Sequence, residues 1–376
     1  MAQCVWRGEE GYSALLATLK EKKVKRLFLV CDEALRFLPL DGFFTAMEAL
    51  GITVTRFSDF QPNPRYESVA AGVERFRETG GEMILAIGGG SAIDVAKCVK
   101  LYSGMDSGTC YLEQEVVPNG VELFAIPTTA GTGSEATRYA VIYYQGEKQS
   151  VTHLSCIPTG VILDGKLLKT LPDYPKKSAM LDALCHGIES TWSVHSDEES
   201  RSYSLEAIRR IMEWMAPYLE GDGQAAEEML LAANLAGKAI NITQTTAGHA
   251  MSYKLTSIYG LAHGHSAALC LPRLWRYMRG HSDRCVDPQG REHLARTFGE
   301  LAEALGCPAG RLPEDRLAQL LRELGLTAPE NWRREDIPKL AASVNPTRLK
   351  NNPVALDEEA LALLYEEILS EEVAEK

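Results

Sequence analysis

The sequence lacks paired-cysteine motifs and long apolar segments. Its nine cysteines are scattered, none stands in a CxxC pair, and their odd number is typical of reduced thiols and not of a disulfide framework. No apolar run reaches the roughly 18 residues that cross a bilayer. Acidic residues in the opening stretch MAQCVWRGEEGY stand where a signal peptide would be apolar. We therefore expect a cytoplasmic protein with no membrane partner.

The sequence also lacks an excess of positive charge. Its formal net charge of −12 argues against a protein that binds nucleic acid or anionic membranes non-specifically. A small anionic substrate stays open, because a local cationic pocket can lie in an acidic protein. The content of 45% apolar and 24% charged residues is typical of a soluble globular protein. A chain of 376 residues suits two sizeable domains.

The two halves of the chain differ in their hydrophobic pattern. In the first half, short and mostly apolar runs alternate with helical patterns, which predicts a doubly wound parallel sheet with ligands at the carboxyl ends of its strands. After about Leu171 nearly everything has 3.6-residue spacing, which predicts a helical domain. We expect an α/β domain over 1–172 and an all-α domain over 173–376. The expected strands are Val24–Cys31, Ile52–Phe57, Met83–Ile87, Glu122–Thr128, Tyr139–Tyr144 and Gly160–Leu163.

A glycine-rich turn follows a buried strand in the segment LAIGGGSAIDVAK. Gly88, Gly89, Gly90 and Ser91 stand between this strand and a helix. Glycines allow the backbone to approach an anion closely, and a helix start offers unpaired N–H groups. A purely structural turn would have the same composition, but the strand–GGGS–helix context favours a pyrophosphate site.

A second loop, IPTTAGTGSE, follows the next strong strand and is rich in hydroxyl groups. Thr128, Thr129, Thr132 and Ser134 supply them. Two such loops at neighbouring strand ends are typical of one dinucleotide lying across the sheet edge. Asp32, at the end of the first long strand, is placed to accept from a ribose 2′-hydroxyl and to repel a 2′-phosphate, which favours NAD(H). A solvated aspartate at a strand end is the alternative.

Acidic and imidazole side chains recur in the second half. Asp182 and His186 are four residues apart and so project from one helix face. The segment GHAMSYKLTSIYGLAHGHSAAL adds His249, His263 and His265. One carboxylate with two or three imidazoles suits Fe²⁺ or Zn²⁺. Spacing alone does not separate a metal site from ordinary hydrogen-bonded helix residues, so both interpretations stay open.

Taken together, GGGSAIDVAK, IPTTAGTGSE, DALCHGIE and GHAMSYKLTSIYGLAHGH resemble the iron-containing alcohol dehydrogenase family over most of the chain. The resemblance implies a Rossmann-like domain, an all-helical metal domain (a fold shared with dehydroquinate synthase), an active site between them, a nicotinamide cofactor and a homodimer. The metal ligands it implies are Asp182, His186, His249 and His263. The cofactor contacts it implies are Gly89, Gly90, Ser91, Asp94, Thr128, Thr129, Thr132 and Ser134, with weaker matches at Asp32, Asn63 and Lys148.

Two departures from the family pattern carry information about the substrate. Tyr253 and Lys254 stand where many members have histidine and then proline, and Arg138 stands where members that handle neutral alcohols have a small residue or proline. Two cations beside a hydride-transfer centre indicate an anionic substrate. The alternative is that Arg138 forms a structural ion pair and Lys254 is solvated. Because Tyr253 replaces the histidine of the family's proton relay, that role stays open between the Tyr253 hydroxyl, a water chain and His265.

Within the family, GHAMSYKLTSIYGLAHGHSAALCLP and VNPTRLKNNPV are most similar to the phosphonoacetaldehyde reductases. This branch reduces phosphonoacetaldehyde to 2-hydroxyethylphosphonate in phosphonate biosynthesis, with hydride from NADH or NADPH. Arg138 and Lys254 are expected to bind the phosphonate. The alternatives are a general dehydrogenase for small aldehydes, alcohols or polyols, a dehydroquinate synthase-like lyase, and a non-catalytic nucleotide-binding protein.

Overall fold

The computed structural model describes residues 3–370, which form two compact units. The first unit runs to Leu171 and includes the segment Gly221–Asn234; the second comprises Pro172–Glu220 and the chain from Leu235 onward. Gly221–Asn234 is bonded to the rest of the first unit: Arg7 donates to Glu228 Oε1 at 2.5 Å, and Asn234 Nδ2 donates to Glu135 Oε1 at 3.1 Å. Among the described residues, no helix has the length and apolar character needed to traverse a membrane.

The first unit is built on a six-stranded parallel sheet with the order β1-β8-β5-β4-β2-β3. Strands β2, β4 and β5 are buried along almost their whole length, as their apolar sequences predict for strands covered on both faces. The strands of this sheet are β1 (Cys4–Arg7), β2 (Arg26–Cys31), β3 (Thr53–Phe57), β4 (Met83–Gly88), β5 (Glu122–Pro127) and β8 (Gly160–Leu163).

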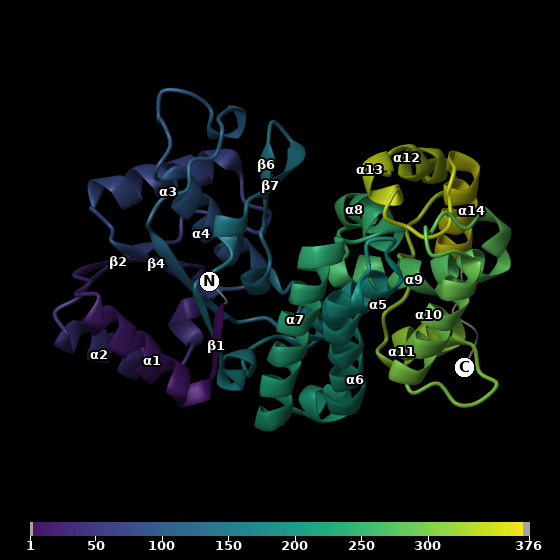
Figure 1. Cartoon of the computed structure of the whole chain (residues 1–376), viewed down its shortest axis with the longest axis horizontal. Coiled ribbons are helices and arrows are strands. Elements are labelled where there is room, and N and C mark those ends of the chain that lie inside the picture. Colours follow the sequence, from purple (N-terminus) through teal and green to yellow (C-terminus); the bar gives the residue numbers. More distant parts are fainter. Residues whose placement is uncertain (1–2, 371–376) are drawn as a thin grey trace. The chain divides into compact units, whose positions relative to one another are not determined.

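Helices cover both faces of this sheet. Figure 1 shows α1 and α2 on one face and α3 and α4 on the other. The chain leaves β2 for its neighbour β3 and then crosses back to β4 on the other side, so the strand order reverses between β2 and β4. Ligands of doubly wound sheets bind at the carboxyl ends of strands at such a switch point. The helices are α1 (Gly8–Glu21), α2 (Asp41–Ala49), α3 (Tyr66–Glu78) and α4 (Gly90–Tyr102).

A separate antiparallel hairpin, β6 (Tyr139–Tyr144) and β7 (Glu147–Thr152), stands outside the parallel sheet. The expected strand Tyr139–Tyr144 is therefore present but pairs with β7. Gln145 and Gly146 both have positive φ, as a two-residue hairpin turn requires. The Tyr143 N–H donates to Pro64 O at 2.8 Å, which holds the hairpin against the segment that follows β3.

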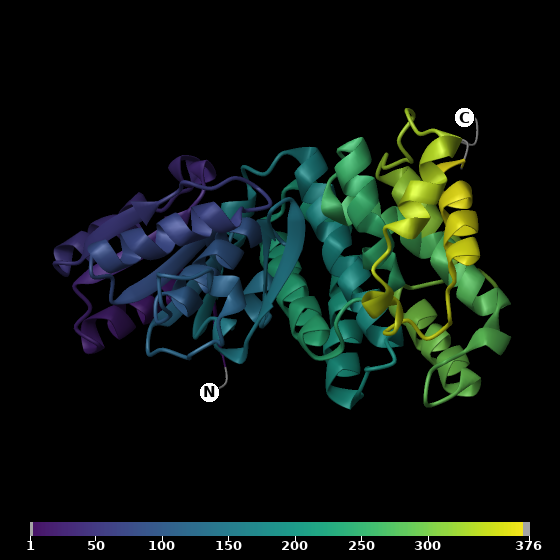
Figure 2. The same cartoon turned by 90° about the horizontal axis from the view of Figure 1, so that it is seen from above.

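The second unit is helical, apart from one isolated antiparallel bridge between Cys285 and Val354 within the described residues. The C-terminal helix α14, yellow in Figures 1 and 2, packs against α9 and α12. The α-helices after α4 are α5 (Asp173–Trp192), α6 (Glu198–Glu220), α7 (Gly223–Thr243, which begins in the first unit), α8 (Ala247–Tyr259), α9 (His263–Gly280), α10 (Arg291–Ala304), α11 (Pro313–Glu323), α12 (Ile337–Ala342), α13 (Pro346–Leu349) and α14 (Glu358–Leu369). Short 3₁₀ turns are η1 (Glu33–Phe37), η2 (Tyr111–Glu113), η3 (Ser134–Ala136), η4 (Leu154–Cys156), η5 (Gly165–Leu168), η6 (Ser282–Arg284) and η7 (Arg334–Asp336).

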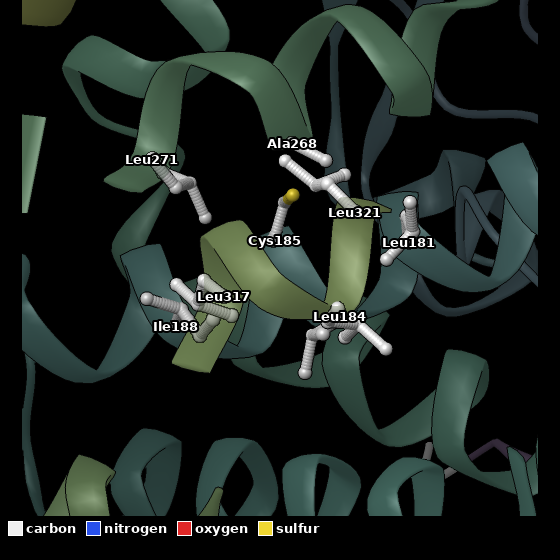
Figure 3. A pocket seen from close by; sticks show the side chains of 9 residues that line it. Leu181, Leu184, Cys185, Ile188, Ala268, Leu271, Leu317 and Leu321 are labelled. Carbon is white, nitrogen blue, oxygen red and sulfur yellow. The ribbon is translucent and has the colours of Figure 1, made fainter. Parts of the chain in front are cut away.

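Helix α5 is the centre of this unit and is buried on more than one face. Figure 3 shows its apolar side, where Cys185 and its neighbours meet side chains of α9 and α11. The cavity left there, lined by leucine, isoleucine, alanine and cysteine side chains, is about 10 Å³, which is about the space for a single water. This side of α5 is therefore core packing, and the predicted ligands Asp182 and His186 are not among its lining residues. The lining residues are Leu181, Leu184, Cys185, Ile188, Ala268, Leu271, Leu317, Leu320 and Leu321.

Candidate functional site

The glycine-rich turn lies at the switch point of the sheet, between the ends of β4 and β2. Gly88 has φ +154°, and a Cβ there would lie 2.6 Å from Ala92 Cβ and 3.1 Å from Asp32 Oδ2. Only glycine fits at this sharp turn into α4, and the start of a helix is the place where backbone N–H groups can bind an anion. Asp32 accepts from the Ala34 N–H at 3.0 Å. Burial raises the pKa of Asp32, although N–H groups of Ala34 and Gly89 oppose the shift.

The hydroxyl-rich loop lies directly against this turn. The Thr128 N–H donates to Gly88 O at 3.1 Å. A Cβ on Gly89 would lie 3.4 Å from Thr129 Oγ1, and one on Gly90 would lie 3.0 Å from Thr132 Oγ1. Ser91 is half-buried in the first turn of α4. The two predicted phosphate loops therefore form one surface at the carboxyl edge of the sheet.

The weaker cofactor candidates lie around the β6–β7 hairpin. Asn63 has φ +59° and precedes Pro64, whose carbonyl accepts from Tyr143. Lys148 is the cross-strand partner of Tyr143 in the hairpin. Both candidates thus flank one tyrosine, within the first unit. Asp94 also reaches the hairpin, because its Oδ2 accepts from the Val141 N–H at 2.9 Å.

Arg138 lies between the hydroxyl-rich loop and the hairpin. Its side chain is half-buried, its Nε donates to the Tyr139 hydroxyl at 3.2 Å, and its guanidinium lies 5.5 Å from the Tyr139 ring centroid. Its carbonyl accepts from the His153 N–H at 3.0 Å. The arginine is therefore held on an ordered backbone, in the same loop system as Thr132 and Ser134.

In the second unit, three of the four expected metal ligands form a compact cluster. One ligand atom from each of Asp182, His249 and His263 lies within 4.8 Å of the others. Asp182 Oδ1 is 3.4 Å from His249 Nε2 and 3.9 Å from His263 Nε2. Ligand atoms around one cation with bonds of about 2.1 Å are about 3 to 4 Å apart. His263 is the most accessible of the three, with 39% of its side chain exposed.

The fourth expected ligand, His186, lies beside the cluster. Its ring stacks on His249 at a centroid distance of 4.4 Å and an interplanar angle of 10°. His186 follows Asp182 by one turn of α5 and is buried. The structure therefore brings all four residues together, three as a ligand set and the fourth stacked on one of them.

Electrostatics in this cluster favour a charged aspartate. Burial opposes ionisation of Asp182, yet His186, His263 and His249 hold its pKa well below its usual range. Burial lowers the pKa of His249, but Glu189 and Asp182 outweigh this effect and raise it to about 10. A proton on His249 is thus stabilised by two carboxylates. A divalent cation would compete with the proton for His249 Nε2, so the donor set fits a metal.

Glu189 is a functional residue that the sequence patterns did not single out. Its Oε1 accepts from Thr246 N at 3.1 Å, Thr246 Oγ1 at 2.6 Å and His249 N at 3.2 Å. Its Oε2 is in short contact with His249 Nδ1. With a metal on Nε2, this contact would keep the remaining proton on Nδ1 and fix the orientation of the His249 ring, as carboxylates do for metal-binding histidines. The signal was its spacing, because Glu189 follows Asp182 by seven residues and shares its helix face.

Two glycines allow the three helices to approach this closely. A Cβ on Gly264 would overlap Ser178 O and lie 2.8 Å from Asp182 N, so α9 touches the backbone of α5 there. A Cβ on Gly248 would lie 3.0 Å from Glu189 Oε1 and 2.5 Å from Leu271 Cδ2. Each glycine precedes or follows a histidine of the cluster, so side-chain volume at either position would displace a ligand.

The three other catalytic candidates of this unit have different surroundings. The Tyr253 ring stacks on His263 at a centroid distance of 5.7 Å. Lys254, the next residue of α8, is exposed. His265 is buried, shares a hydrogen bond of 3.1 Å between its Nδ1 and the Tyr174 hydroxyl, and does not belong to the cluster of Asp182, His249 and His263. Burial lowers the pKa of His265, which favours its neutral form.

The parallel sheet with its glycine turn suits a dinucleotide, and the Asp–His–His cluster of the helical unit suits a divalent metal. Two family models cover the chain: iron-containing alcohol dehydrogenase at residues 3–165, and the C-terminal domain of the Fe-containing alcohol dehydrogenase family at residues 177–369. The chain belongs to the iron-containing alcohol dehydrogenase family. It is an NAD(P)-dependent oxidoreductase of the alcohol dehydrogenase and aldehyde reductase type.

The chain is similar to several characterised relatives. Phosphonoacetaldehyde reductase of Streptomyces viridochromogenes is 34% identical over 316 residues, which cover 80% of either chain. A crystal structure of an iron-containing alcohol dehydrogenase from Thermotoga maritima is 27% identical with a TM-score of 0.83 and covers 98% of both chains. Sulfoacetaldehyde reductase from Bifidobacterium kashiwanohense, solved in complex with NAD⁺, is 25% identical with a TM-score of 0.85 and covers 98% of both chains.

These comparisons confirm the expected family, its phosphonoacetaldehyde reductase branch, the fold class and the enzyme class. The roles of individual residues and the division of the chain near residue 172 stay predictions.

Proposed function

We propose that the protein reduces a small anionic aldehyde, phosphonoacetaldehyde, to 2-hydroxyethylphosphonate with NADH or NADPH. The observation that carries the proposal is Arg138, a half-buried cation in the segment that directly follows the hydroxyl-rich loop. Two relatives support the substrate class, because phosphonoacetaldehyde and sulfoacetaldehyde both carry a strong anionic group. Guanidinium is the side chain best suited to bind such a group through two parallel hydrogen bonds.

In this proposal, Asp182, His186, His249 and His263 hold Fe²⁺ or Zn²⁺. When bound, the cation supplies Lewis-acid polarisation of the aldehyde oxygen. Glu189 fixes the ring orientation of His249. The exposed edge of His263 marks the open side of the cluster.

The first unit would bind the coenzyme at its sheet edge. Gly89, Gly90 and the start of α4 bind the pyrophosphate through backbone N–H groups. Thr129 and Thr132 add hydroxyls beside this turn. Asp32, at the end of β2, accepts from a ribose hydroxyl, which makes NADH the favoured coenzyme.

Arg138 and Lys254 bind the phosphonate in this proposal and thereby fix which face of the aldehyde meets the hydride. Tyr253 is the favoured proton donor for the product alcohol, because its ring lies beside His263, whereas His265 is engaged by Tyr174. A cytoplasmic location, a role in phosphonate biosynthesis and a homodimeric state belong to the same proposal.

The test is NADH oxidation with phosphonoacetaldehyde and with propanal, measured for the wild type, Arg138→Ala and Arg138→Lys. A hydrogen bond to a charged group contributes about 1.5–3 kcal/mol, so Arg138→Ala should lower kcat/KM for phosphonoacetaldehyde about 10- to 100-fold, mainly through KM. Propanal should change less than about 3-fold. Arg138→Lys should show a smaller loss than Arg138→Ala, since lysine keeps the charge but cannot donate two parallel hydrogen bonds. Arg75→Ala, at an exposed arginine of α3 in the same unit, is the matched control.

Three results would contradict the proposal in different ways. Equal losses for both aldehydes would remove the role of Arg138 as an anion anchor. A wild type that prefers propanal would favour a general aldehyde or polyol dehydrogenase, and the 29% identity to 1,3-propanediol dehydrogenase of Citrobacter freundii makes this the second candidate. Turnover of a substrate without net NADH consumption would indicate lyase chemistry.

A further inference from the structure

A buried lysine in the first unit binds the segment that carries Arg138. Lys97 lies on α4 and is fully buried. Its Nζ donates to Ser134 O at 2.6 Å, Ser134 Oγ at 3.0 Å, Thr137 O at 2.8 Å, Thr137 Oγ1 at 3.1 Å and Tyr139 O at 2.6 Å. An ammonium group has three N–H donors, so these acceptors share them. Every one of these acceptors belongs to the six residues 134–139.

Asp94 completes this arrangement from one turn earlier on the same helix. Its Oδ1 accepts from Ser134 Oγ at 2.6 Å and its Oδ2 from the Val141 N–H at 2.9 Å. Asp94 and Lys97 are three residues apart, so they face the same side of α4. Together they hold both ends of the segment 134–141. We call these two residues and their bonds to that segment the Lys97 clamp.

The bonds of the clamp fix the backbone on either side of Arg138. The carbonyls of Thr137 and Tyr139 both point at Lys97 Nζ, whereas the carbonyl of Arg138 points the other way and accepts from His153 N. This alternation is that of an extended chain. The direction in which the Arg138 side chain leaves the backbone is therefore set by bonds to its two neighbours.

A packing role alone does not explain a charged residue here. Burying an ammonium group is costly unless it is paired and fully hydrogen-bonded, and an apolar side chain would fill the same space without that cost. Burial lowers the pKa of Lys97, and the neighbouring Asp94 opposes the shift. All of the hydrogen bonds of Lys97 go to one segment, so the function of the buried charge is best explained as fixing the position of that segment.

We propose that Lys97 is a positioning residue that sets the direction of Arg138 and thereby the preference for anionic aldehydes. This inference rests on the proposed function, in which Arg138 binds the anionic group. It also links the coenzyme turn to the substrate anchor, because α4 begins at Gly90. Asp94 belongs to the clamp and Ser134 to the segment that it holds, so both act on the coenzyme through the shape of the loop.

The test compares Lys97→Met with Lys100→Met. Lys100 is a second buried lysine of α4, but its Nζ binds Ser155 O, outside residues 134–141. Lys97→Met should raise KM for phosphonoacetaldehyde about 10-fold or more, with a smaller change for propanal, because misplacing one anchor costs binding at that anchor. In an Arg138→Ala background, Lys97→Met should have no further effect on this KM. Equal losses for both aldehydes, or additive effects in the double variant, would overturn the inference.

A second readout separates this inference from the proposed function. Hydrogen–deuterium exchange of residues 134–141 should rise about 10-fold or more in Lys97→Met, while β2 is unaffected and Lys100→Met resembles the wild type. Thr137→Val removes only one acceptor of Lys97, so it should raise the exchange of this segment less than 10-fold. It serves as the test variant if Lys97→Met does not fold. Unchanged exchange in both variants would overturn the clamp whatever the kinetics. A wild type without preference for the anionic aldehyde would overturn the proposed substrate. The positional role of Lys97 would then be decided by hydrogen–deuterium exchange of residues 134–141 alone.

Discussion

At the scale of single residues, the metal cluster depends on the proton that His249 carries. Glu189 accepts from His249 Nδ1, so Nε2, which lies 3.4 Å from Asp182 Oδ1, is the nitrogen from which a metal would displace the proton. Glu189 is itself held by Thr246, which donates twice to Oε1. A buried carboxylate with this many donors stays ionised, and His249 and Thr246 keep its pKa below the usual range despite burial.

Glu189→Gln is expected to weaken metal binding about 10- to 100-fold, as loss of a carboxylate behind a histidine ligand does. The amide of glutamine can donate to Nδ1, which moves the histidine proton to Nε2 and blocks the ligand atom. The measurement is metal affinity by competition with a chelator on the purified protein. Glu213→Gln, at an exposed position of α6, serves as the control. Equal affinities of the two variants would show that Glu189 has no part in the site.

The sequence identified the members of this cluster better than it identified their supports. The four-residue spacing placed Asp182 and His186 on one helix face, and the family resemblance added the ligand role and the two further histidines, His249 and His263. Glu189 follows on the same face of α5, but spacing does not distinguish a buried carboxylate from a solvated one. The support role becomes visible only when α8 places His249 beside it, which depends on packing between helices far apart in sequence.

At the scale of elements, apolar runs predicted the strands well and their order not at all. Met83–Ile87 is β4 to within one residue, and Gly160–Leu163 is β8. Strand β1, with its mixed polarity, and strand β7, with its polar surface, gave no clear signal. The strand order depends on which apolar faces the helices cover, and that is decided by long-range packing.

The approach of α9 to α5 is a second property of the elements, and it depends on Gly264. Gly264→Ala should destabilise the protein by about 1–3 kcal/mol, because the added methyl group overlaps the α5 backbone at Ser178 and Asp182. It should also lower metal occupancy, since His263 moves with the helix. Thermal unfolding and metal content are the measurements.

Gly280→Ala is the matched control for this variant, since it lies on the same helix with nothing within 4 Å of the added carbon. Alanine has a higher helix propensity than glycine, by up to about 1 kcal/mol, so this substitution should be neutral or stabilising. The two glycine substitutions are thus expected to have opposite signs. A stable, metal-replete Gly264→Ala protein would show that close backbone contact is not needed for the cluster.

At the scale of the whole molecule, the residues proposed to bind the coenzyme and those proposed to bind the metal belong to different units. The glycine turn, the hydroxyl-rich loop and Arg138 all belong to the first unit, and the Asp–His cluster belongs to the second. Metal and coenzyme should therefore stabilise different parts of the chain when they are added separately.

Chelation followed by re-addition of Fe²⁺ or Zn²⁺ tests this division. Removing the metal should abolish aldehyde reduction and increase hydrogen exchange in α5, α8 and the start of α9, while NADH should protect residues 88–94 and 128–134. A ligand at 100 times its Kd stabilises the state that binds it by about 2.7 kcal/mol, so exchange through opening of that unit should slow about 100-fold. Exchange slows because each ligand binds only the folded form of its own site, so ligand binding lowers the population of the open form. Full turnover after exhaustive chelation, or metal-dependent protection confined to the glycine turn, would contradict the ligand set Asp182, His186, His249 and His263.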